Sequence, residues 1–139
     1  MTGDIDVTSP VQPELEEELQ KLGFVRPSGV GRSLRGWVHP ELKFGFEVVA
    51  NVPMDGSVDA AHILLVDDLD QGAGLAIISA EDLIADRMGQ YASRSAREML
   101  SQAQQLLDLH LDADLPYLER RIREETLGDY GLEDIQGAG

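Results

Sequence analysis

The chain has 139 residues, no cysteine and a formal net charge of −15. Its length is typical of one domain, and the absence of cysteine excludes disulfide scaffolds, thiolate zinc sites and cysteine nucleophiles. The negative charge repels duplex DNA and anionic membranes, and no apolar run approaches the roughly 20 residues that a membrane span needs. The acidic, polar first residues do not resemble a signal peptide. These features predict a cytoplasmic protein that binds neither membranes nor duplex DNA.

The first segment of interest is "TGDIDVTSP", in which Asp4 and Asp6 flank Ile5. In a strand, residues i and i+2 share a face, so both carboxylates would converge on one side. Carboxylate oxygens are the ligands that Mg²⁺ prefers. The alternative is an exposed acidic terminus, and the spacing alone favours neither interpretation.

A short helix is predicted next, over residues 13–22, where Leu15, Leu19 and Leu22 recur at helical spacing. Residues 24–40 contain prolines and glycines that suit a hairpin or a loose loop. The basic side chains of this region could contact a phosphate, although ordinary solvated surface is the alternative. They are Arg26, Arg32, Arg35 and Lys43.

The segment 42–50, "LKFGFEVVA", alternates as a strand does. Phe44, Phe46 and Val48 would face one side, and Glu47 the other. An acid within an apolar strand is unusual, so Glu47 is the candidate third carboxylate. We therefore predict that the sheet brings Glu47 beside Asp4 and Asp6. The alternative is a solvent-facing position on an open sheet.

Two short apolar runs, residues 62–68 and 75–79, fit buried strands, and the pattern becomes helical from Ser79. Helices are predicted over 79–91, 93–111 and 112–128, followed by a frayed tail at 132–139. The fold class is therefore α+β: a small mixed sheet with a flanking helix, then a C-terminal helical layer. We expect the sheet region 1–78 and the helical region 79–139 to share one compact domain and one continuous core.

These pieces together resemble the DNA-polymerase-β-type nucleotidyltransferase superfamily, in particular its small prokaryotic branch of minimal nucleotidyltransferases and AbiEii-type proteins. Asp4-Ile5-Asp6 matches the family's Asp-h-Asp element, where h is apolar, and Phe46-Glu47-Val48 matches its later h-Asp/Glu-h element. The segment from Ser79 to Arg87 resembles the helix that follows the sheet. The likeness extends from Gly3 to about Glu125.

The resemblance implies Mg²⁺-dependent transfer of a nucleoside monophosphate from an NTP to a hydroxyl of a protein or RNA. It implies that Asp4, Asp6 and Glu47 hold the metal, with Glu47 also aiding deprotonation of the attacking hydroxyl. Arg32, Arg35 or Lys43 would then neutralise the triphosphate.

The family pattern also has a Gly-Gly or Gly-Ser element about a dozen residues before the Asp-h-Asp element, whereas only three residues precede Asp4. Either the start of the sequence is misplaced or trimmed, or this is a shortened member of the family, and we expect impaired catalysis in the chain as given. The departure favours an alternative of a different class, a non-catalytic regulatory or interaction module of a toxin–antitoxin type. Such a module would bind a protein partner or a second copy of itself.

Overall fold

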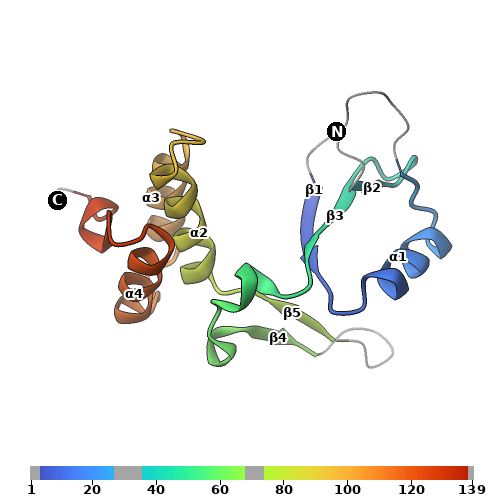
Figure 1. Ribbon diagram of the computed structural model, residues 1–139, viewed down its shortest axis with the longest axis horizontal. Coiled ribbons are helices and arrows are strands. Elements are labelled where there is room, and N and C mark those ends of the chain that lie inside the picture. The colour runs from blue at the N-terminus through green and yellow to red at the C-terminus, as the bar shows by residue number, and fades with distance from the viewer. Residues whose placement is uncertain (1–3, 27–35, 68–73, 138–139) are drawn as a thin grey trace. The chain divides into compact units, whose positions relative to one another are not determined.

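The computed structural model describes residues 4–26, 36–67 and 74–137. The chain forms two compact units, Met1–Ser57 and Val58–Gly139, which are described here one at a time. Each unit combines strands and helices, which confirms the predicted α+β class (Figure 1). That the two predicted regions share one continuous core stays a prediction.

The first unit is a three-stranded sheet with one helix. Its elements are β1 (Asp4–Thr8), α1 (Gln12–Lys21), β2 (Gly36–Val38) and β3 (Gly45–Ala50). The strand order is β1-β3-β2, with β3 parallel to β1 and antiparallel to β2. A parallel pair needs a long crossover connection, and the segment that contains α1 and β2 supplies it.

The core of the first unit lies between α1 and one face of the sheet. Leu19, Phe24 and Trp37 are buried there, and Phe44 and Phe46 pack against them. The Phe24 and Phe46 rings lie 5.4 Å apart in a tilted arrangement that favours aromatic pairs. The predicted orientation of Phe44 and Phe46 is thus confirmed. Leu22 differs from the prediction, because it is 67% exposed beyond the last turn of α1.

The second unit combines a two-stranded ribbon with three helices. The antiparallel strands are β4 (Leu64–Val66) and β5 (Leu75–Ile77), and the helices are α2 (Ala80–Ala92), α3 (Met99–Leu109) and α4 (Leu115–Glu125). Helix α2 packs against both α3 and α4. The buried core between the helices comprises Ile84, Ala85, Met88, Ala103, Leu118, Ile122 and Ile135.

Three local predictions for the second unit are wrong. The tail is not frayed over its whole length, because Leu132–Asp134 forms a 3₁₀ helix and Ile135 is 2% exposed within the core. Helix α3 begins at Met99 rather than residue 93, since the Ser93 and Ser95 hydroxyls donate to the Gln90 carbonyl and end α2. The two apolar runs expected to form buried strands form β4 and β5, but these strands are largely exposed, with Leu65 at 71% and Leu75 at 52%.

The described helices are short and carry many charges. None of those in residues 4–26, 36–67 and 74–137 is long and apolar enough to cross a membrane. Their stability instead comes from the amphipathic packing of the two cores.

Candidate carboxylate site

The pairing of β1 with β3 places Asp6 beside Glu47. The register of this parallel pair aligns Ile5 with Phe46 and Asp6 with Glu47. Neighbouring strands lie about 4.8 Å apart, and aligned residues direct their side chains to the same face. The prediction that the sheet brings Glu47 beside the first strand is therefore confirmed for Asp6.

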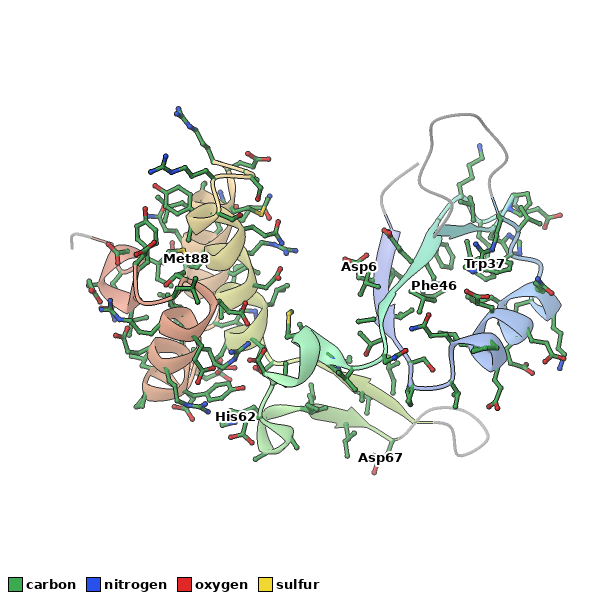
Figure 2. The ribbon with its side chains drawn as sticks, viewed as in Figure 1. Asp6, Trp37, Phe46, His62, Asp67 and Met88 are labelled. Atoms are coloured by element: carbon green, nitrogen blue, oxygen red, sulfur yellow. The ribbon has the colours of Figure 1, made fainter. Side chains whose placement is uncertain are left out.

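The two carboxylates occupy the face of the sheet that is not packed against α1. Figure 2 shows Phe46 pointing toward α1 and Asp6 pointing away from it. Asp6 is exposed and Glu47 is partly buried. Within the part of the chain that the structure describes, neither side chain has an ion-pair partner, so no cationic side chain neutralises the two carboxylates. This arrangement favours binding of a cation.

The remaining predicted site residues are placed less fully. The backbone of Asp4 pairs with Gly45 at the start of the same ladder, but its side chain lies outside the described residues. Arg32 and Arg35 lie outside the described residues altogether. Lys43 is exposed in the turn before β3 with a φ of 59°, a left-handed conformation, and its amide donates to the His39 carbonyl at 3.0 Å.

The chemistry of the described donors fits a hard cation, with a limited ligand set. Carboxylate oxygens suit Mg²⁺, which keeps several of its own waters and commonly takes only one or two protein carboxylates. Among the side chains that the structure describes, no three acidic or histidine groups lie close enough together to hold a metal ion. Asp6 and Glu47 would therefore form a two-carboxylate site, to which Asp4 is the predicted third contributor.

A second polar cluster, in the helical unit, was not predicted from the sequence. The carboxylate of Asp82 and the guanidinium of Arg121 are fully buried and paired at 2.7 Å. Asp82 also accepts hydrogen bonds from the Ser79 hydroxyl at 2.8 Å and from the Tyr117 hydroxyl. The Ser79 hydroxyl also caps the start of α2 by accepting a hydrogen bond from the Asp82 amide at 3.1 Å.

Arg121 connects this cluster to the end of α4. Its guanidinium donates to Glu124 and Glu125, each at 2.7 Å. Burial lowers the pKa of Arg121, but the hydrogen bonds to Asp82, Glu124 and Glu125 outweigh that effect and raise it. Arg121 is therefore charged at any pH at which the unit is folded, and the buried Asp82 carboxylate always faces a cation.

His62 completes the cluster on its outer side. Its ring stacks on Tyr117, with centroids 3.5 Å apart and planes 5° from parallel, and its Nε2 lies 3.2 Å from an oxygen of Asp114. The Tyr117 hydroxyl accepts a hydrogen bond from the Asp59 amide. These contacts join the segment before β4 to α4, so we interpret the cluster as a structural connection within the second unit.

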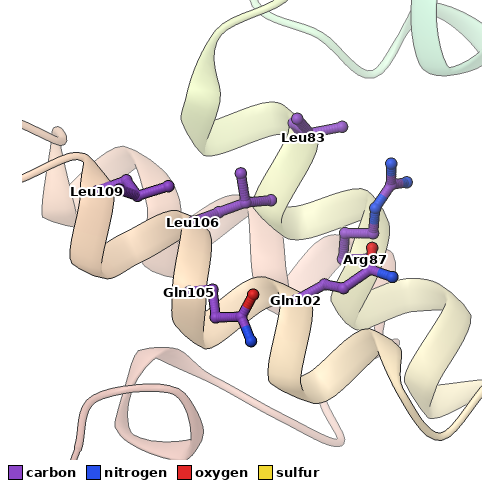
Figure 3. A pocket seen from close by; sticks show the side chains of 6 residues that line it. All are labelled: Leu83, Arg87, Gln102, Gln105, Leu106 and Leu109. Carbon is purple, nitrogen blue, oxygen red and sulfur yellow. The ribbon is translucent and has the colours of Figure 1, made fainter.

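Two surface hollows lie elsewhere in the described part of the chain. One hollow of about 220 Å³ lies between α2 and α3. Its lining includes Leu83 and Arg87 from α2 and Leu106 and Leu109 from α3 (Figure 3). The other, of about 440 Å³, lies beside Trp37 and Phe24. Neither is lined by Asp6 or Glu47, whose carboxylates stand on an open sheet face.

Comparison of the chain with family models, with curated proteins and with solved structures finds no match in any of the three.

Proposed function

We propose that this chain is a nucleotidyltransferase-like protein that uses Mg²⁺ to transfer a nucleoside monophosphate from an NTP to a hydroxyl of a protein or RNA, with catalysis impaired in the chain as given. The observation that supports the proposal best is the parallel register of β1 and β3. It aligns Asp6 with Glu47 on the sheet face opposite the core, although 40 residues separate them in sequence.

The residue types fit this chemistry. Asp6 and Glu47 would hold the metal together with Asp4, and a bound Mg²⁺ would neutralise charge on the phosphates. Glu47 would accept the proton of the acceptor hydroxyl as its oxygen attacks the α-phosphorus. The bond from that phosphorus to the bridging oxygen breaks, and pyrophosphate leaves with the electron pair. Lys43, Arg32 and Arg35 would offset the charge of the triphosphate.

The first test is metal binding by the full chain. Manganese can replace Mg²⁺ at oxygen sites and is counted directly by electron paramagnetic resonance. We expect weak binding that Asp6→Asn or Glu47→Gln lowers at least tenfold, because a two-carboxylate site loses half its charge. The matched control is Glu14→Gln, since Glu14 is an exposed carboxylate on α1, outside the β1–β3 ladder.

The second test is transfer of label from α-labelled NTPs, incubated with Mg²⁺ or Mn²⁺ and a lysate that supplies protein and RNA acceptors. Label transferred by the unaltered chain but not by the Asp4→Asn/Asp6→Asn variant would support the proposal. Manganese binding that is indifferent to Asp6→Asn and Glu47→Gln, together with no transfer, would refute it.

A further inference from the structure

His62 lies between two carboxylates of the second unit. It ends the 3₁₀ turn Ala60–His62, beside the start of α4 (Figure 2). Its Nε2 lies 3.2 Å from an oxygen of Asp114, and its Nδ1 lies 3.9 Å from an oxygen of Asp59. Stacking on Tyr117 fixes the plane of the imidazole ring. Each of the two ring nitrogens therefore has a carboxylate beside it.

A neutral imidazole satisfies only one of these two neighbours, because it has one N–H donor and one bare nitrogen. Asp114 is ionised near neutral pH, since hydrogen bonds from the Tyr117 amide and from His62 lower its pKa, and a carboxylate can only accept a hydrogen bond. The proton of a neutral His62 therefore lies on Nε2. The bare Nδ1 is buried, has no hydrogen-bond partner within the described residues, and stands near the negative charge of Asp59. A buried polar atom without a partner destabilises the fold.

Protonation of the ring removes this defect. The imidazolium has two N–H donors, so Nε2 keeps its hydrogen bond to Asp114 while Nδ1 gains an ion pair with Asp59. The positive charge also interacts favourably with the aromatic face of Tyr117, whose hydroxyl stays neutral because burial raises its pKa. The folded unit therefore fits the imidazolium better than the imidazole.

Arg120 opposes a positive charge on His62. Its guanidinium lies 3.6 Å from Asp59 and 5.1 Å from the centre of the Tyr117 ring. The opposition is limited, because the Arg120 side chain is about half exposed to water and Glu124 binds it more closely, at 3.0 Å. Asp59 can therefore pair with both cations.

The remaining charges around the imidazole favour its protonated form or cancel each other. The carboxylate of Glu81, which accepts from the Asp114 amide at 2.8 Å, adds a negative charge on the Nε2 side. Asp82 and Arg121 lie behind the Tyr117 hydroxyl and pair with each other at 2.7 Å. Carboxylates therefore outnumber cations around the ring.

We propose that His62 is a proton-operated latch, which holds the segment before β4 on the start of α4 in mildly acidic solution and loosens it above about pH 7. Histidine is the side chain whose charge ordinarily changes between about pH 5 and 8. Because the folded unit favours the protonated ring, the contribution of His62 to stability is present in mildly acidic solution and is lost as the pH rises. The proton concentration thus sets how firmly β4 is attached to the helices.

The test compares melting temperatures of the full chain at about pH 5.5 and about pH 8, which span the titration range of histidine. Tyrosine absorbance reports the melting, because all three tyrosines lie in the second unit. General repulsion in a chain with a net charge of −15 changes alike in every variant, so the informative quantity is the difference from His62→Gln. Glutamine keeps an N–H donor for Asp114 but cannot take up a proton. On acidification the unaltered chain should gain about 2–4 °C more than His62→Gln, the shift that a partly exposed ion pair gives in a unit of this size.

The matched control is His110→Gln, at the end of α3 in the same unit, because His110 has no ion-pair partner among the described residues. This variant should keep the full gain, whereas Asp59→Asn, which removes the carboxylate beside Nδ1, should lose about half of it or more. Amide hydrogen exchange of the unaltered chain needs no variant. Relative to the amides of α3, protection of residues 62–66 should be about threefold higher, or more, in mildly acidic solution than at about pH 8.

Three results would overturn the proposal. The first is an equal gain in melting temperature for the unaltered chain and for His62→Gln. The second is loss of the gain in His110→Gln, which would assign the pH response to the other histidine of the unit. The third is protection of residues 62–66 that follows that of α3 at both pH values, which would show that the segment before β4 is held equally firmly by the neutral and the protonated ring.

Discussion

Replacing Arg121 by methionine should destabilise the helical unit by about 3 kcal/mol. The substitution removes the charged partner of Asp82 and leaves a fully buried carboxylate with two neutral donors, Ser79 and Tyr117. Breaking a buried pair from one side typically costs about 3–5 kcal/mol, and the two remaining donors place the expected loss at the lower end. Glu124 and Glu125 are partly exposed, so water can solvate them and they add little.

The positions of the tyrosines and the tryptophan allow unfolding of the two units to be followed separately. All three tyrosines belong to the second unit and the single tryptophan, Trp37, belongs to the first. Urea unfolding followed by tyrosine absorbance should therefore shift to lower urea in Arg121→Met. The double variant Asp82→Asn/Arg121→Met, which leaves no buried charge, should recover part of the loss. A loss below about 1 kcal/mol, or a double variant less stable than Arg121→Met alone, would refute the reasoning.

Three further predictions concern the cores and the acid response. Leu118→Ala should cost about 2–5 kcal/mol in urea unfolding because Leu118 is fully buried, whereas Leu111→Ala, at a 94% exposed position, should cost less than about 0.5 kcal/mol. Hydrogen bonds from the Tyr117 amide and from His62 lower the pKa of Asp114, so this carboxylate stabilises the fold above about pH 4 and loses that contribution as the pH falls through its folded pKa. Melting temperatures measured from pH 6 to pH 2 should accordingly fall less steeply for Asp114→Asn, and an unchanged slope would contradict the assignment. If the chain has one continuous core, tryptophan and tyrosine signals should report a single coincident transition, and two separate transitions would instead show independent domains.

The features that were predictable from sequence are those with a local period. Alternation in residues 42–50 placed Phe46 toward the core and Glu47 away from it, and the structure agrees. The pairing of Glu47 with Asp6 depends on the register between β3 and β1. Local alternation predicts which face of the sheet Glu47 lies on, but not which residue of β1 it aligns with. The sequence signal for this pairing is Glu47 itself, because an acid within an apolar strand is unusual.

Local periodicity did not predict the buried polar cluster around Asp82 and Arg121. Arg121 lies beside Ile122 in a segment rich in arginine and glutamate, which periodicity assigns to a solvated face. Its burial depends on Asp82, 39 positions earlier, reaching it across the α2–α4 contact. Likewise, Ile135 is buried because the 3₁₀ turn at Leu132–Asp134 folds the tail back, with the Asp134 carboxylate accepting from the Gly131 amide. Neither the Asp82–Arg121 contact nor the burial of Ile135 leaves a periodic signal in the sequence.

The parallel pairing of β1 and β3 also has a kinetic consequence. Pairing of the two strands closes a loop of about 40 residues. The chain loses the conformational entropy of this loop before the ladder contributes any stability. The carboxylate pair therefore does not exist in the unfolded chain and is assembled only when β1 docks along β3. A cation that binds both carboxylates would slow the undocking of β1, so protection of the β1 amides from hydrogen exchange would report occupancy of the pair.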